Sequence, residues 1–263
     1  MRSTRHRNPG RSDRPRPTGD SRERTRVSRK PPRDYVAPVQ RFRLRYAKRG
    51  RLRFASHRDF QRAFERALRR AGVPMAYSAG FSPHPKISYA NAAPTGTASE
   101  AEYLEIGVAR ECAADQLRAA IDAALPPGLD IVDVVEAQTS DFAARLQASR
   151  WRIVLAGLTP AEVAGPVAEL LSRPECLVER LTKNGVRQFD VREALLEARV
   201  APAPNGAEGC AILTVVLRQA TPAVRPDDVL AALRSVAPAP VADGWQQPPP
   251  QVTREQQGPL AEG

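Results

Sequence analysis

The stretch Arg41-Phe42-Arg43-Leu44-Arg45-Tyr46 alternates basic and apolar residues with a period of two. This period is typical of a strand with one buried and one solvated face. We expect Phe42, Leu44 and Tyr46 to face a core and the arginines to form a basic outer face. A turn at residues 48–51 precedes a second short alternation at residues 52–54, so a hairpin or a bulged strand is predicted to begin the folded part of the chain.

A helix is predicted directly after this strand, from Ser56 to Ala71. Ser56 is a suitable N-cap and Asp59 an acidic residue of the first turn. Apolar residues follow at helical spacing until Gly72 and Pro74 end the pattern. The opposite face carries Arg58, Arg62, Arg66, Arg69 and Arg70. Charged exposed faces are common, but few carboxylates lie at i+4 here, so anion or RNA binding is favoured for this face.

The remaining elements complete two halves. Strands at residues 87–89 and 103–108, a helix at 113–125 and a strand at 129–135 predict a ferredoxin-like order, βαββαβ, over residues 38–137. A weaker repeat is expected over residues 138–236, with strands at 151–155, 176–181, 189–194 and 211–217, a loop at 202–209, and helices at 159–171 and 225–236. The predicted fold class is therefore α+β, with two ferredoxin-like halves in one compact body.

Two tails are expected to flank this body. The formal net charge of the chain is +11, and residues 1–34 contribute +8 of it, because eleven Arg and one Lys face four acidic residues there. With few large apolar residues, residues 1–37 are predicted to form a disordered basic tail, which either binds polyanions nonspecifically or is simply solvated. Residues 237–263, rich in Pro and Gln, are also predicted to be disordered.

No signal or membrane-spanning pattern occurs, which favours a cytoplasmic protein without membrane contact.

The loop from Gly80 to Lys86 holds His84 between two prolines, and His57 lies at the predicted helix start. With Asp59, Glu100 and Glu102 nearby, the two histidines could form an acid/base pair or a metal site. The alternative is local: His57 bonds at the helix start and His84 shapes a loop. The spacing matches no known metal motif, so we favour the local interpretation and predict no metal.

Two carboxylates precede the predicted strand at residue 103. Glu100 and Glu102 are expected on one side of the chain, where Lys86 or an arginine could form a structural ion pair with them.

The three cysteines are widely spaced, which argues against a disulfide framework or a cluster motif and favours small core residues. No nucleotide-binding glycine loop or nucleophile elbow occurs. No cofactor and no catalytic residue is predicted.

Five ordered segments between residues 43 and 108 resemble a known family. These are residues 43–50, 52–59, 66–72, 80–88 and 96–103, and the triplet Asp190-Val191-Arg192 is similar to a shorter motif of the same family. The family is the radical-SAM-linked domain of unknown function, and this chain resembles its stand-alone form. The resemblance implies association with a radical SAM enzyme or, through genomic neighbourhood, with a ribonuclease of the E/G type.

The resemblance also implies a shared binding site. Together with the basic helix, its residues are Ser56, His57, Asp59, Arg66, Arg69, Arg70, Gly80, Phe81, Pro83, His84, Pro85, Lys86, Ser99, Glu100, Glu102, Asp190 and Arg192. Our leading hypothesis is a non-catalytic accessory protein that binds RNA or presents a substrate, with the Arg helix and the His84 loop forming one anion-binding surface. The alternatives are an enzyme with a two-histidine centre and a protein-interaction module.

Overall fold

The structure is a computed structural model that describes residues 37–260, apart from residues 80, 184, 205–208, 239–240, 242–244 and 246–247. The predicted basic tail, residues 1–37, therefore lies outside the described residues except for its last member. No helix within the described ranges is both long and apolar enough to cross a membrane.

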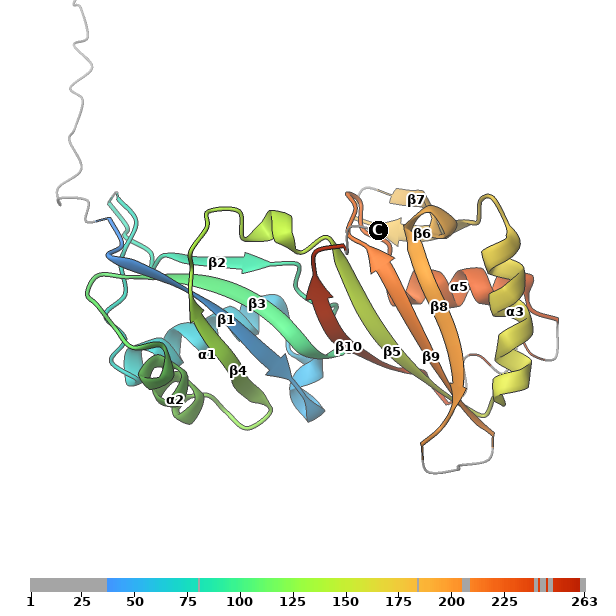
Figure 1. Cartoon of the computed structure of the whole chain (residues 1–263), viewed down its shortest axis with the longest axis horizontal. Coiled ribbons are helices and arrows are strands. Elements are labelled where there is room, and N and C mark those ends of the chain that lie inside the picture. The colour runs from blue at the N-terminus through green and yellow to red at the C-terminus, as the bar shows by residue number, and fades with distance from the viewer. Residues whose placement is uncertain are drawn as a thin grey trace, which may run out of the picture.

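The chain forms a mixed α+β fold in which a long sheet is covered by helices (Figure 1). The strands are β1 Gln40–Lys48, β2 Ile87–Ala90, β3 Ala98–Val108, β4 Leu129–Glu136, β5 Ala148–Ala156, β6 Leu177–Thr182, β7 Gly185–Asp190, β8 Leu195–Pro202, β9 Cys210–Arg218 and β10 Gln251–Gly258. The helices are α1 His57–Arg70, α2 Ala114–Ala124, α3 Pro160–Ser172, α4 Val191–Ala194 and α5 Pro226–Val236, with short 3₁₀ turns at Gly50–Phe54 and Ala143–Arg145. The α+β prediction is confirmed.

In the first half, the elements follow the predicted order β1-α1-β2-β3-α2-β4. β1 lies between β4 and β3, β2 pairs with the far side of β3, and all three pairings are antiparallel. The predicted faces of β1 are confirmed, since Phe42, Leu44 and Tyr46 are buried. The Tyr46 ring stacks on Phe60 of α1 at 4.3 Å between centroids, so α1 covers this side of β1.

The predicted strand at residues 52–54 is wrong. Gly50 has a left-handed φ of 53°, which turns the chain at the end of β1. The amides of Leu52 and Ala55 then bond the carbonyls of Arg49 and Leu52, which makes a 3₁₀ turn. The alternation Leu52-Arg53-Phe54 suits either structure, and three residues are too few to tell the two apart.

In the second half, β5 lies between β10 and β9, and β8 pairs with the outer side of β9, again antiparallel. β6 and β7 form a separate hairpin. The predicted strand at residues 189–194 is wrong beyond Asp190, because the Asp190 side chain accepts hydrogen bonds from the amides of Arg192 and Cys176 and starts the short helix α4. β8 follows at Leu195, ahead of the predicted loop.

The prediction of a disordered tail from residue 237 is wrong for residues 251–258. These residues form β10, which pairs antiparallel with β5 and parallel with the start of β3. β10 therefore joins the two halves into one sheet. Its sequence, QVTREQQG, lacks an apolar alternation because its two buried side chains, Arg254 and Gln257, are polar. Burial of such groups depends on hydrogen-bond partners that are distant in sequence.

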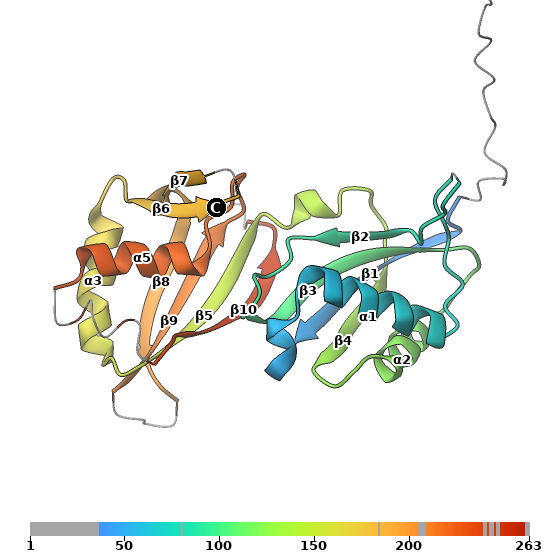
Figure 2. The same cartoon turned by 180° about the vertical axis from the view of Figure 1, so that it is seen from behind.

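The helices cover one face of the sheet and leave the other open. Among the described residues, buried apolar side chains form a cluster in each half, between the sheet and either α1 and α2 or α3 and α5. Figure 2 views the molecule from the helical side, whereas Figure 1 views the strands from β4 through β1, β3, β10, β5 and β9 to β8 with no helix across them. The outward-facing residues of β1 and β3 therefore lie on this open face.

Candidate functional site

The residues predicted at the start of α1 make local contacts. Ser56 caps the helix by accepting a hydrogen bond from the Asp59 amide at 3.2 Å, and its hydroxyl donates to the Asp59 carboxylate at 2.6 Å. This side-chain hydrogen bond lowers the pKa of Asp59. The His57 ring meets the edge of Tyr89 at 5.1 Å between centroids. These contacts agree with the local interpretation of this motif.

The arginine face of α1 is exposed on the helical side of the sheet. Arg66 and Arg69 are exposed there, and Arg70 donates to the Ala124 carbonyl at the end of α2. Because Phe60 and Phe64 of the same helix pack onto the sheet, the arginines point away from it. This basic surface faces away from the open face, and Arg70 at its end lines a hollow of about 560 Å³ between α1 and α2.

The His84 loop belongs to the other side of the molecule. Gly80 lies outside the described residues, Phe81 is 73% exposed, and Pro83, Pro85 and Lys86 are half-buried. The loop is closed by the bonds from the Ser78 amide to the His84 carbonyl, 2.8 Å, and from the His84 amide to Ser78 Oγ, 3.0 Å. His84 lines a hollow together with Arg41 and Glu105 of the open face. The Arg helix and the His84 loop therefore do not share a surface.

The two predicted histidines are also apart. His57 contacts Tyr89 near the end of β2, whereas His84 precedes that strand. The six residues from His84 to Tyr89 are mainly extended, and the five steps between them span on the order of 16 Å. Within the part of the chain that the structure describes, no three His, Cys, Asp or Glu side chains are grouped as a metal site requires.

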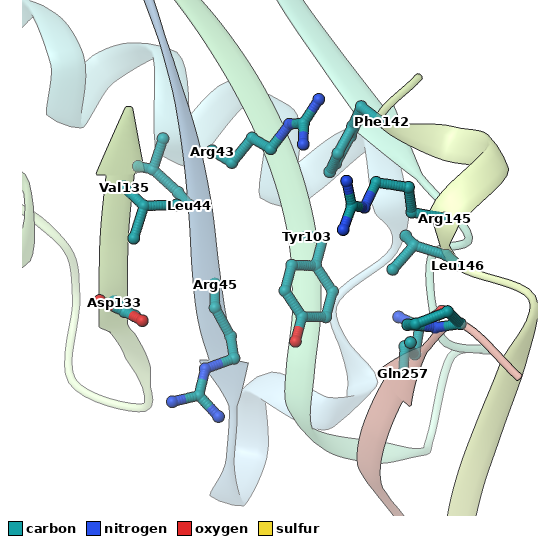
Figure 3. A pocket seen from close by; sticks show the side chains of 12 residues that line it. Arg43, Leu44, Arg45, Tyr103, Asp133, Val135, Phe142, Arg145, Leu146 and Gln257 are labelled. Atoms are coloured by element: carbon teal, nitrogen blue, oxygen red, sulfur yellow. The ribbon is translucent and has the colours of Figure 1, made fainter. Parts of the chain in front are cut away.

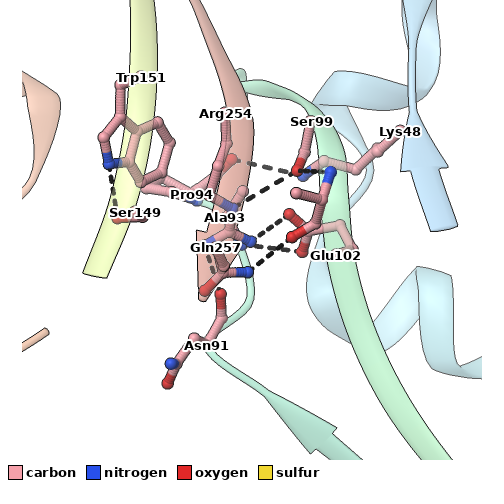
Figure 4. A network of polar contacts seen from close by, with 11 residues as sticks. Lys48, Asn91, Ala93, Pro94, Ser99, Glu102, Ser149, Trp151, Arg254 and Gln257 are labelled. Carbon is pink, nitrogen blue, oxygen red and sulfur yellow. Dashed lines mark hydrogen bonds and ion pairs between the residues drawn. The ribbon is translucent and has the colours of Figure 1, made fainter. Parts of the chain in front are cut away.

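The predicted carboxylates are both in ion pairs with arginine. Glu100 is paired with Arg49 at the surface, and Glu102, 2% exposed, is paired with Arg254 of β10. The Ala93 amide donates to the second Glu102 oxygen at 3.0 Å, and Arg254 donates to the Asn91 carbonyl at 2.6 Å. Figure 4 shows this network between β3 and β10. The ion-pair partner of Glu102 is therefore an arginine that is distant in sequence, and not Lys86.

Further polar groups surround this buried ion pair. Ser99 lies within 3.5 Å of Arg254 Nε, and Gln257 donates to the Ala101 carbonyl at 2.6 Å. Lys48, 5% exposed, donates to the Pro94 carbonyl at 3.4 Å, and burial lowers the pKa of its amine. The network fastens β10 to β3. Ser99 and Glu102 of the family motif thus help to hold the two halves together.

Asp190 and Arg192 lie in the second half and stabilise local structure. Asp190 caps α4, and Arg192 donates to the carbonyls of Leu171 at 3.2 Å and Leu195 at 3.1 Å. These bonds tie the end of α3 to the start of β8. The structure therefore brings the predicted residues together in several local groups, and not in one site.

A groove on the open face gathers residues that the prediction did not include. It lies where the two halves meet and consists of two adjoining hollows of about 330 and 360 Å³ that share Arg45, Tyr103 and residues 257–259. We call it the junction groove. Figure 3 shows the Tyr103 ring with Arg45 on one side and Arg145 on the other, and Phe142 beside Arg43. Arg150 of β5 lines the second hollow.

The junction groove is basic. Among the described residues, Arg45, Arg145 and Arg150 form no ion pair, although hydrogen bonds and, to a smaller extent, the charge of Arg145 lower the pKa of Asp141. Arg43 is engaged: it bonds Glu105 at 3.2 Å and the Thr139 carbonyl at 2.6 Å, and its guanidinium lies 5.5 Å from the centre of the Phe142 ring. Asp133 and Glu255 are the carboxylates of the lining.

Tyr103 is the central aromatic residue of this groove. Partial burial raises the pKa of its phenol, while the charges of Arg45 and Arg254 oppose the rise. The phenol is therefore neutral at physiological pH, and the ring has cationic groups around it. Sequence reasoning missed Tyr103, although the alternation of residues 103–108 contains the signal: with Leu104 and Ile106 in the core, Tyr103 must face the opposite side.

The fold and the groove define a two-part α+β protein with an open, basic sheet face. The chain matches, over residues 41–226, the family described as an uncharacterized protein conserved in bacteria (DUF2344). This match covers more than half of the chain, so the protein belongs to that family. No curated protein matches the chain.

Proposed function

We propose that the protein is a non-catalytic accessory protein that binds single-stranded RNA across the junction groove. The observation that carries the proposal is Tyr103, an aromatic ring on an open sheet face between arginines that lack ion-pair partners. Proteins that bind single strands combine a basic groove for the backbone with aromatic rings on which bases stack. The choice of RNA over DNA as the ligand rests on the resemblance to the radical-SAM-linked domain.

The location and partners of the protein belong to the same proposal. A cytoplasmic protein would present its RNA to a radical SAM enzyme or to a ribonuclease of the E/G type, as the resemblance implies. Exposed Leu177, Leu181 and Val186 on the β6–β7 hairpin support a contact with another protein, since grouped apolar side chains on a surface favour association. Co-purification of either enzyme with the full chain tests the proposed protein contact. Leu181→Asp, which places a charge on the hairpin, should reduce the amount of enzyme that co-purifies.

The test of RNA binding is the affinity of the full chain for a short uridylate RNA, with Tyr103→Ala and Tyr103→Phe compared. The Ala variant should bind at least about fivefold more weakly, because stacking on one base contributes about 1–3 kcal/mol. The Phe variant keeps the ring and should bind like the parent.

Phe54→Ala is the matched control, because Phe54 is an exposed aromatic residue outside the groove that contacts the Arg53 guanidinium. Equal affinities of the parent protein and of Tyr103→Ala would overturn the proposal. DNA of the same sequence tests the preference for RNA.

A further inference from the structure

The hollow beside the His84 loop is a second basic site on the open face. It has a volume of about 390 Å³ and is lined by Arg41, His84 and Lys86, by the hydroxyl-bearing Ser78 and Ser88, and by Glu105. A volume of this size is within the range of small-ligand pockets. Its donors are those that bind phosphate: guanidinium, imidazole, ammonium and hydroxyl groups.

The hollow is held by a rigid frame. The Lys86 amide donates to the Ala76 carbonyl and the Ala76 amide to the Gly107 carbonyl, both at 2.8 Å, while Pro83 and Pro85 restrict the loop. Gly107 forms the floor: a Cβ at this position would lie 2.9 Å from Pro38 Cγ and 3.4 Å from Lys86 Cβ. Glycine therefore lets Pro38 and Lys86 approach the end of β3.

The charge of the hollow is only partly neutralised from within. Glu105, 12% exposed, accepts a hydrogen bond from Arg43 at 3.2 Å and lies 3.9 Å from Arg41. Arg43 is therefore the main partner of this carboxylate, and the Arg41 side chain remains 52% exposed. The hollow can thus present Arg41 and His84 to an anion.

We infer that this hollow binds the terminal phosphomonoester of the strand that occupies the junction groove. Arg41 and Arg45 lie on the same face of β1 on either side of Arg43, which is held by Thr139 and Phe142, so one strand that crosses this segment reaches both places. A terminal phosphate differs from an internal one in its additional charge and oxygen acceptors, and several donors gathered around one hollow can engage these together. The exposed Phe81 on the same loop offers a ring to the last base. This inference rests on the proposed RNA binding.

The experiment compares one short uridylate RNA with a 5′-phosphate, with a 3′-phosphate and with hydroxyl groups at both ends, each titrated with the full chain. One phosphorylated form should bind about tenfold more tightly than the hydroxyl form, in line with charged hydrogen bonds. Arg41→Gln/His84→Gln should abolish this difference. Arg66→Gln/His57→Gln, which removes the same side chains from the helical side, should preserve it.

The outcomes separate the two proposals. Equal affinity for the three RNAs, with binding still dependent on Tyr103, overturns the phosphate site alone. Absence of RNA binding overturns both proposals. Inorganic phosphate or uridine 5′-monophosphate that binds as tightly as the phosphorylated RNA would identify a site for a free anion and also overturn the inference.

Discussion

The two faces of the first half are both rich in arginine, but they differ in the aromatic residues that accompany the arginines. The helical face carries five arginines on α1, with no aromatic residue exposed among them on that helix, and the hollow beside Arg70 has no aromatic residue in its lining. The open face also carries arginines, and four of them, Arg43, Arg45, Arg145 and Arg150, lie around Tyr103 in the junction groove. Nonspecific attraction requires only charge, whereas a positioned strand requires a hollow surface and rings for its bases. Charge density by itself therefore does not locate a binding site.

The largest expected effect on stability comes from breaking the buried ion pair that fastens β10 to β3 beneath the open face. Arg254→Met leaves Glu102 buried without its partner, and such a loss costs about 3–5 kcal/mol. The free energy of unfolding in urea should fall by this amount. β10 also supplies Gln257 and Gly258 to the junction groove, so RNA affinity should fall with it.

The double variant Glu102→Gln/Arg254→Met provides the control, because it removes both members of the buried ion pair and leaves neither of them without its partner. It should recover much of the lost stability. If Arg254→Met unfolds at the same urea concentration as the parent, the ion pair does not hold the two halves together.

A smaller effect, on the salt dependence of RNA binding, is expected when three arginines of one face are replaced by glutamine. Arg45→Gln/Arg145→Gln/Arg150→Gln removes three cations of the groove and should reduce the salt dependence of RNA binding by about 2 in the log–log slope, at about 0.7 per phosphate contact on a single strand. Arg62→Gln/Arg66→Gln/Arg69→Gln removes the same charge from α1 and should leave the slope nearly unchanged. Equal slopes for the two triple variants would remove the distinction between the faces.

The smallest effect concerns the buried phenol on the helical side of β1. Burial is the main cause of the raised pKa of Tyr46, and the charge of Glu102 adds to it. The unfolded state loses this proton near pH 10 while the folded state keeps it, so the folded state binds more protons above that pH. Stability should therefore be fully present below about pH 10 and decline as the pH rises further.

Tyr46→Phe should lower the pH dependence of unfolding above pH 10 without changing RNA affinity. The measurement is a series of urea titrations at increasing pH. An unchanged slope in the variant would mean that other groups, such as Tyr89, cause the alkaline loss.

The amino-acid sequence alone determined the elements that depend on local pattern. The faces of β1, the Ser56 cap and apolar side of α1, and the order of strands and helices in the first half follow from periodicity and turn residues. These signals act over a few residues, so they can be read without the fold.

Only the tertiary structure decided how distant residues meet. The polar strand β10 is stable because Glu102 and the Asn91 carbonyl, more than 150 residues away, satisfy Arg254, and no local pattern contains that information. The same pairing brings Tyr103, Arg145 and Arg150 to one groove. Hydrogen bonding and burial across a sheet depend on register between strands, and register is fixed by the folded chain as a whole.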